Sequence, residues 1–147
     1  MEGNYPKGGA VSAENEAVVR RFYEQMCNER KNELAPELFA ADHKFHDPQV
    51  PTPDGPDGVT QAVSAYQEGV EGHWDIDDIF STADKVVVRW TGSGTHTGTI
   101  NGIPPTGKSL SVDAISIHRM DSGKIAETWE VWDTLGFLQQ LGVVPAG

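Results

Sequence analysis

The stretch Lys-Ile-Ala-Glu-Thr-Trp-Glu-Val-Trp-Asp-Thr-Leu-Gly-Phe-Leu-Gln-Gln-Leu-Gly, residues 124–142, contains a change of periodicity that decides the fold. Its first half is rich in β-branched and aromatic residues and follows the turn Asp121-Ser122-Gly123, so it predicts a strand. From Leu135 onward the apolar residues recur at helical spacing, which predicts a short amphipathic helix. The chain therefore passes from a strand to a helix at Asp133.

The alternation of this strand decides which side chains share a face. One face carries Ile125, Glu127, Trp129, Val131 and Asp133, and the other carries Ala126, Thr128, Glu130 and Trp132. We expect Trp129 and Asp133, on the first and more apolar face, to border one internal cavity. A carboxyl group among apolar neighbours is desolvated, which raises its pKa toward the range useful for proton transfer. The alternative is that Asp133 only caps the last helix by accepting a backbone N–H, which would lower its pKa.

The composition limits the class of protein. A chain of 147 residues forms one domain and can bury a substantial core. The single cysteine, Cys27, excludes an internal disulfide, and the formal net charge of −11 argues against nucleic acid or an anionic membrane as a partner. No apolar run reaches the roughly 18 residues that span a membrane, and the chain opens without a charged-then-apolar leader. We therefore expect a cytoplasmic protein with a small, neutral or apolar ligand.

The remaining segments predict helices followed by strands. Residues 1–12 are predicted to be a flexible arm and 13–147 a single domain. Helical spacing predicts helices at about 13–29 and 57–70, with a short helix at Pro36 between them. Alternation predicts strands at 42–48, 74–80, 86–97, 110–119 and 124–132. This order indicates an α+β fold in which three N-terminal helices pack on a curved antiparallel sheet and enclose a pocket.

Two segments leave alternatives open. The proline-rich segment 49–58 predicts a loop that is either a binding lid or a passive rim. On the strand 110–119, one face carries Asp113, Ile115, Ile117 and Arg119, and the other carries Val112, Ala114, Ser116 and His118. Both faces mix polar and apolar residues, so the sequence does not decide which of them lines the pocket.

Six segments together carry a family resemblance. They are Glu-Asn-Glu-Ala-Val-Val-Arg-Arg-Phe-Tyr-Glu (14–24), Phe-His-Asp-Pro (45–48), Gly-Thr-His-Thr-Gly (94–98), Gly-Ile-Pro-Pro-Thr-Gly-Lys (102–108), Gly-Lys-Ile-Ala-Glu-Thr-Trp-Glu-Val-Trp-Asp (123–133) and Leu-Gln-Gln-Leu-Gly (138–142). These segments resemble the SnoaL-like polyketide cyclase (ester cyclase) family of the NTF2-like superfamily. The resemblance covers nearly everything after residue 13 and implies an NTF2-like cone fold.

The resemblance also implies a reaction, an intramolecular aldol ring closure on a polyketide-like methyl ester without a metal or an organic cofactor. In that chemistry an aspartate near the end of the last strand is the acid/base, and Asp133 occupies such a place here. One carboxyl group can remove a proton from a carbon acid and later protonate the carbonyl under attack. The superfamily also contains isomerases, epoxide hydrolases, hydroxylases and non-enzymes. The alternatives are therefore another acid/base enzyme of this fold and a non-catalytic small-molecule-binding protein.

Further candidates for substrate binding come from several segments: His46, Trp74, His96, Asp113, Glu127 and Trp129. The two histidines lie where a cone fold has its pocket mouth, with capping and a sheet-edge hydrogen bond as their structural alternatives. The two tryptophans are candidates for an aromatic wall against a planar ligand, with core packing as the alternative. The histidines show no helical metal-ligand spacing, so we assign no metal. Zinc at His43 and His46 is a minor alternative.

The tryptophan on the opposite face of the last strand suggests an assembly. Trp132 alternates away from Asp133 and is expected to pack against a second subunit, because an open sheet needs its outer surface covered. We therefore expect a homodimer, or a higher homo-oligomer, formed through the sheets.

Overall fold

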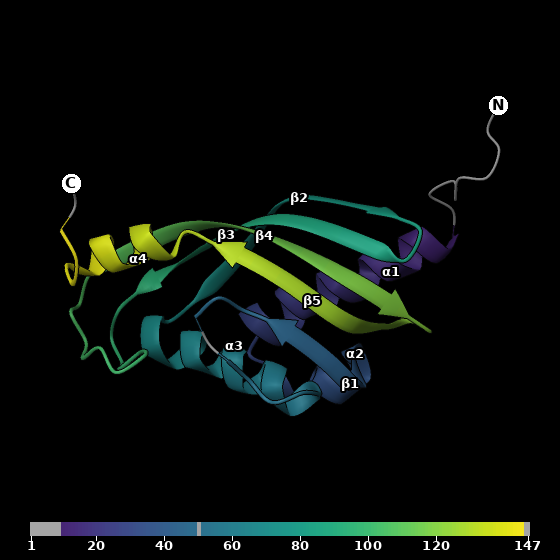
Figure 1. Cartoon of the computed structure of the whole chain (residues 1–147), viewed down its shortest axis with the longest axis horizontal. Coiled ribbons are helices and arrows are strands. Elements are labelled where there is room, and N and C mark those ends of the chain that lie inside the picture. Colours follow the sequence, from purple (N-terminus) through teal and green to yellow (C-terminus); the bar gives the residue numbers. More distant parts are fainter. Residues whose placement is uncertain (1–9, 50, 146–147) are drawn as a thin grey trace.

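A computed structural model describes residues 10–49 and 51–145 as four α-helices and one five-stranded sheet (Figure 1). Two short segments, the π-helical η1 (Phe22–Asn28) and the 3-10 helical η2 (Asn32–Leu34), connect the first two α-helices. The helices are α1 (Ala10–Arg21), α2 (Ala35–Leu38), α3 (Pro56–Val70) and α4 (Thr134–Leu141). The strands are β1 (Phe39–His46), β2 (His73–Thr82), β3 (Lys85–Thr95), β4 (Ser109–Asp121) and β5 (Lys124–Trp132). The α+β prediction is confirmed.

The strands are ordered β1-β5-β4-β3-β2 across the sheet. Successive strands from β2 to β5 pair antiparallel, as the hairpin-linked pattern predicted. The pair at the edge, β1 with β5, is parallel. The prediction of a wholly antiparallel sheet is therefore wrong for this pair. A short hairpin forces antiparallel pairing, whereas most of the chain separates β1 from β5 and leaves their relative direction free.

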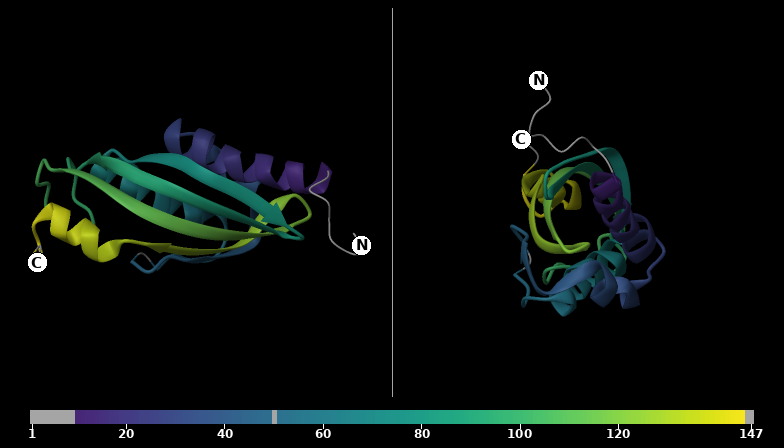
Figure 2. Two further views of the ribbon diagram at one scale, coloured as in Figure 1. Left: turned by 90° about the horizontal axis from the view of Figure 1, so that it is seen from above. Right: turned by 90° about the vertical axis from the view of Figure 1, so that its right-hand side faces the viewer.

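The sheet curves around the helices and encloses the core (Figure 2). Buried side chains of η1 meet the inner face of the sheet in one apolar cluster, which includes Phe22, Tyr23, Met26, Val86, Val88 and Ile125. A smaller cluster lies where α4 packs on β4, and it includes Leu110, Phe137 and Leu141. Gly94 allows the end of α3 to approach β3, because a Cβ there would lie 1.9 Å from the carbonyl oxygen of Val70. The helices thus cover the concave face at both ends of the sheet.

The element boundaries differ from the sequence prediction mainly at the first helix. This helix was predicted at about 13–29, and the structure has α1 from Ala10 followed by the π-helical η1. Residues 10–12, predicted to belong to a flexible arm, are therefore helical, and residues 1–9 of that arm lie outside the described residues. None of the helices in the described parts of the chain is long and apolar enough to cross a membrane.

A β-bulge in β5 decides which side chains face inward. Met120 pairs with Ile125. The next pair is Arg119 with Glu127, which leaves Ala126 as an extra residue. Ile125 and Ala126 are consequently both buried, at 0% and 6% exposed. Beyond the bulge the even-numbered side chains of β5 face the helices and the odd-numbered ones face outward, the reverse of the predicted alternation.

Candidate functional site

An apolar cavity lies between the concave face of the sheet and the helices. Eight aromatic side chains from seven elements line it: Phe22 and Tyr23, Phe45, Tyr66, Trp74, Trp90, Trp132, and Phe137. The space open to the centre of a water-sized sphere is about 60 Å³, several times the ~10–15 Å³ that one water molecule needs. Because flat aromatic rings line the cavity, it suits a planar apolar ligand. Glu130 is the one acidic side chain among the lining residues.

Glu130 reaches the cavity from β5 because the bulge turns it inward. Its Oε1 accepts a hydrogen bond from Ser116 Oγ at 3.0 Å, and Ser116 in turn accepts one from Trp90 Nε1 at 3.0 Å. Burial raises the pKa of Glu130 well above its usual range, and the charge of Asp47 and a hydrogen bond with it raise the pKa further. The hydrogen bond from Ser116 acts in the opposite direction. Glu130 thus holds its proton at pH values where an exposed glutamate has lost it.

Asp47 directly follows β1 and brings a second carboxyl group to Glu130. Its Oδ1 accepts a hydrogen bond from the backbone N–H of Gln49 at 2.7 Å, and its Oδ2 accepts one from the hydroxyl of Tyr66 on α3 at 3.4 Å. Burial and the charges of Asp47 and Glu130 raise the pKa of Tyr66. Tyr66 is therefore a neutral donor, which orients the carboxyl group of Asp47.

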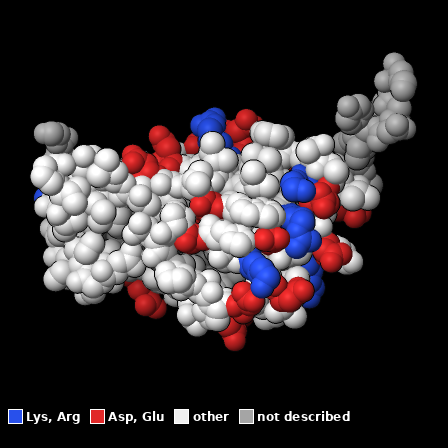
Figure 3. Space-filling model, viewed as in Figure 1, with Lys and Arg blue, Asp and Glu red and all other residues white. Residues whose placement is uncertain are grey.

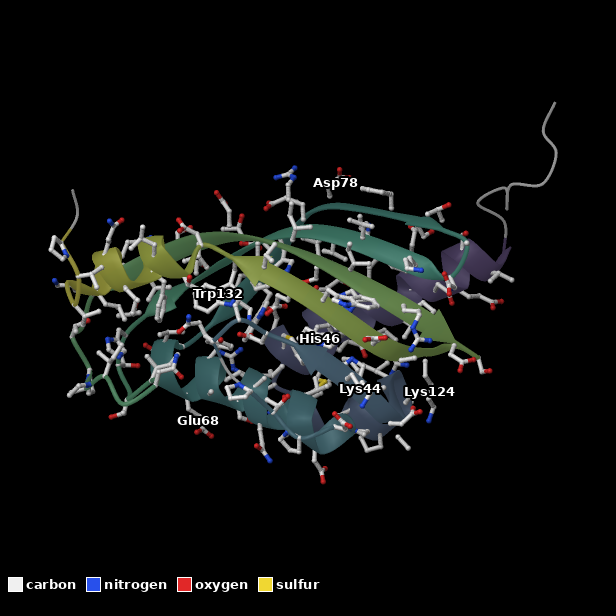
Figure 4. The ribbon with its side chains drawn as sticks, viewed as in Figure 1. Lys44, His46, Glu68, Asp78, Lys124 and Trp132 are labelled. Atoms are coloured by element: carbon white, nitrogen blue, oxygen red, sulfur yellow. The ribbon has the colours of Figure 1, made fainter. Side chains whose placement is uncertain are left out.

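Trp132 forms the cavity wall beside Glu130, in the space between β5 and α3 (Figure 4). Its ring makes edge contacts with Tyr66 and Phe137, at centroid distances of 5.9 and 5.3 Å. The Nε1 atom of Trp132 is buried and has no hydrogen-bond partner among the described residues. Since an unpaired buried donor is costly, a ligand oxygen that reached this N–H would be stabilised by it. Trp132, predicted to pack against a second subunit, instead faces the cavity.

A chain of buried polar groups continues from the cavity into the core. Tyr23 OH lies 2.9 Å from His118 Nε2, and His118 Nδ1 lies 2.8 Å from Thr128 Oγ1. His43 Nε2 lies 3.0 Å from the same Thr128 oxygen. Burial lowers the pKa of His118 to about 3 and that of His43 to about 4, so both imidazoles are neutral. No group of three or more His, Cys, Asp or Glu residues in 10–49 and 51–145 is arranged to hold a metal ion.

Asp133 lies outside the cavity lining, and its side chain is exposed. Its Oδ1 accepts a hydrogen bond from the backbone N–H of Gly136 at 2.9 Å, the geometry of a helix N-cap for α4. The prediction that Asp133 and Trp129 border one internal cavity is therefore wrong, because the bulge turns both outward. The alternative interpretation, that Asp133 caps the last helix, is confirmed.

Three more predicted binding residues lie together on the outer surface of β1 and β5. The rings of His46 and Trp129 stack at 5.6 Å with an interplanar angle of 17°, and His46 Nε2 lies 2.8 Å from Glu127 Oε2. Arg119 contacts the other Glu127 oxygen at 3.4 Å. Figure 3 shows acidic and basic side chains side by side over this part of the molecule, and few charges over α4. This cluster is solvated, and none of its three predicted binding residues lines the aromatic cavity.

The other predicted binding residues have three different environments. Trp74 lines the cavity, whereas Asp113 is exposed on the outer face of β4. His96 is fully buried, and its Nδ1 accepts a hydrogen bond from the backbone N–H of Thr106 at 3.2 Å, which closes the connection between β3 and β4. The structure also shows which face of β4 points toward the helices, because Ser116 is buried and Ile115 is exposed.

Glu130 and Asp47, the two carboxyl groups of the site, were not selected from the sequence. No local signal selected Glu130, because the sequence left the inward face of β4 open and the pairing of Ser116 with Glu130 depends on the bulge. Asp47 was visible only as part of the Phe-His-Asp-Pro segment. Their proximity depends on the parallel pairing of β1 with β5, which no local pattern shows.

Comparison with known proteins supports a family assignment. Residues 17–141 match the model of the SnoaL-like polyketide cyclase family. The chain belongs to this family. A comparison with curated proteins gave no match. The family match and the structural neighbours support a cyclase-type function.

The solved structures include several neighbours of similar length. TsrD from Streptomyces laurentii is 28% identical, with a TM-score of 0.81, and the alignment covers 90% of this chain and 97% of that one. A candidate polyketide cyclase from Bacillus cereus is 30% identical, with a TM-score of 0.75 and coverage of 89% and 82%. IdmH from Streptomyces antibioticus, also a candidate polyketide cyclase, is 28% identical, with a TM-score of 0.73 and coverage of 87% and 98%. These neighbours share the NTF2-like cone fold predicted from the sequence.

Proposed function

We propose that this chain catalyses the intramolecular aldol-type ring closure of a polyketide-like methyl ester, with Glu130 as the acid/base. The observation that supports this most strongly is a single carboxyl group with a raised pKa in a cavity walled by aromatic rings. A carboxyl group with a raised pKa serves as a general acid and base better than an exposed carboxylate does. The family match favours the same class of reaction.

The proposed steps balance without any added oxidant or reductant. The ionised carboxylate of Glu130 removes a proton from a ligand carbon that lies beside carbonyl groups, which leaves an enolate. The enolate carbon attacks a second carbonyl of the same ligand and forms the ring bond. The resulting alkoxide takes the proton back from Glu130. Ser116 orients the carboxyl group, and the unpaired N–H of Trp132 is a donor for a developing oxygen charge.

A matched pair of variants tests this proposal. Glu130→Gln keeps the shape of the side chain but removes the titrating group, so turnover of an aromatic β-keto methyl ester should fall roughly 10²–10⁴-fold. Asp133→Asn changes an exposed helix cap outside the cavity and should leave turnover unchanged. Equal turnover by wild type and Glu130→Gln would refute the proposal. Tight binding of the esters without turnover by wild type would instead favour the non-catalytic binding protein.

We further propose a homodimer formed through the outer face of the sheet. This face exposes apolar side chains on neighbouring strands, with Ile115 46%, Trp129 38% and Val131 66% exposed. A hollow beside them is bordered by Arg89 and Asp113, which carry opposite charges. In a two-fold dimer the arginine of one copy can meet the aspartate of the other while the apolar strips pack together. Sedimentation velocity at micromolar concentration tests this arrangement.

A further inference from the structure

Glu130 lies between two separate hollows. One is the aromatic cavity, and the other is an outer pocket lined by Phe45, His46, Asp47, Pro48, Pro51, Thr52 and Glu130. Only Phe45 and Glu130 line both hollows, and Asp47 lines only the outer pocket. The outer pocket lies at the surface, since His46, Pro48 and Pro51 are exposed. The carboxyl group of Glu130 is thus reached from the ligand side and, next to Asp47, from the solvent side.

The two carboxyl groups are hydrogen-bonded to each other, and Asp47 is held in place from two further directions. Gln49 N–H fixes one Asp47 oxygen at 2.7 Å, and Tyr66 OH approaches the other at 3.4 Å. A hydrogen bond between two carboxyl groups requires a proton on one of them, because carboxylates have no donor. Two carboxylates in contact would also repel each other, so such a pair retains one proton.

The other neighbours of Glu130 do not neutralise it. Its charge acts on Tyr23 and Cys27 of η1 and on Tyr66 of α3, and burial raises the pKa of all three groups. These groups are therefore neutral near pH 7. Ser116 on β4 contributes a neutral hydroxyl donor. None of these described neighbours is a cation, and His46, which also lines the outer pocket, is paired with Glu127. A shared proton is therefore what compensates the charge of the pair.

We propose that Asp47 is a positioning residue for the catalytic proton. Asp47 holds this proton while Glu130 acts as the base, and Asp47 exchanges the proton with water in the outer pocket. The inference rests on the proposed role of Glu130. In the resting protein Glu130 holds the shared proton, and before ring closure that proton passes to Asp47, which leaves Glu130 ionised. Glu130 then takes the proton from the ligand carbon and later gives it to the alkoxide. While Glu130 carries the ligand's proton, Asp47 exchanges its own proton with water and then trades the new proton for the one on Glu130.

Two rates distinguish this relay from a structural role. Cyclisation does not require exchange with solvent, because Glu130 can return the same proton. Exchange of the acidic C–H of a non-cyclisable ester with D2O does require it. Replacing Asp47 with Asn should therefore reduce the exchange rate about tenfold or more relative to the cyclisation rate. A control variant, Asp42→Asn, changes an exposed aspartate on the same strand and should alter neither rate.

Chemical rescue adds a second test that does not depend on the geometry of asparagine. Asp47→Ala leaves room in the outer pocket, so sodium formate should restore C–H exchange in Asp47→Ala but not in Glu130→Gln. If formate does not rescue and the ratio of rates in Asp47→Asn equals that of wild type, the relay is refuted. A Glu130→Gln enzyme that still cyclises the ester would instead refute the proposed function itself.

A titration of the free protein covers the case in which no ester is turned over. With carboxyl-labelled glutamate, the NMR titration of Glu130 should move to lower pH by about one unit or more in Asp47→Asn, because a neighbouring negative charge has been removed. The Asp42→Asn protein should titrate like wild type. An unchanged Glu130 titration in Asp47→Asn would refute the carboxyl pair, whatever the catalytic result.

Discussion

The two buried histidines predict a steep loss of stability in acid. His118 and His43 are 0% and 1% exposed, and burial lowers their pKa values from 6.5 to about 3 and about 4. The unfolded chain binds protons at both residues below about pH 6.5, whereas the folded chain does not until the pH reaches the lowered values. Their contribution to stability is therefore complete above pH 6.5 and is lost as the pH falls.

The size of this loss follows from the shifts. Each pH unit below 6.5 costs about 1.4 kcal/mol per histidine. Between pH 7.5 and pH 4.5 the loss is about 2.5 kcal/mol for each residue and about 5 kcal/mol for the pair. Glu130 acts in the opposite direction, because its pKa is raised and the folded state keeps its proton above the usual value of 4.5. The pH dependence of wild-type stability therefore combines a loss in acid from the histidines with a loss at higher pH from Glu130.

A difference between variants isolates one histidine. His118→Gln removes the titrating ring, and the amide can still bond Tyr23 and Thr128. The advantage of wild type over His118→Gln in the free energy of unfolding, measured by urea denaturation, should shrink by about 2.5 kcal/mol from pH 7.5 to 4.5. His73→Gln, a change at an exposed histidine on β2, should leave the profile parallel to that of wild type. Parallel profiles for wild type and His118→Gln would refute the account of a neutral buried imidazole.

Three further predictions concern the site and its surroundings. Glu130→Gln should raise the melting temperature more at pH 8 than at pH 5, because the buried carboxyl group opposes folding most when the unfolded chain has ionised it; an equal shift at both pH values would contradict this. Asp133→Ala should lower the free energy of unfolding by about 1 kcal/mol through loss of the α4 cap, with turnover unchanged; calorimetry and a turnover assay check both parts. Val131→Glu places a charge at the centre of the proposed dimer face, so sedimentation velocity should show a monomer, whereas Asp121→Asn, a change in the exposed turn between β4 and β5, should not change the sedimentation.

The architecture was predictable because the spacing of apolar residues within each segment indicates a helix or a strand. Helical spacing located α3 from Pro56 to Val70 to within a residue, and alternation located the four later strands to within about three residues at each end. The partner of β1 was not predictable in the same way. Its pairing with β5 joins residues about 85 positions apart, such as Lys44 with Glu127. Local sequence patterns do not predict such a contact. This pairing nevertheless brings Asp47 close to Glu130.

The identity of the carboxyl group in the cavity depended on one inserted residue. The turn at Ser122 and Gly123 sets Asp121 opposite Lys124, and without interruption this register would place Trp129 opposite Ser116. The odd-numbered residues of β5 would then face the cavity, as predicted from the alternation. The bulge at Ala126 shifts the register by one, so Glu130 stands opposite Ser116.

The bulge leaves little trace in composition, because Ala126 is as compatible with a regular strand as with an irregular one. The bulge is stabilised by contacts between residues that are distant in sequence. Thr128 can bond both His118 on β4 and His43 on β1 only if it faces inward, and the inward side of β5 then includes Glu130 and Trp132. The buried polar chain and the cavity carboxyl group are thus consequences of the same register. A change that removed the extra residue of the bulge would turn both away from the helices together.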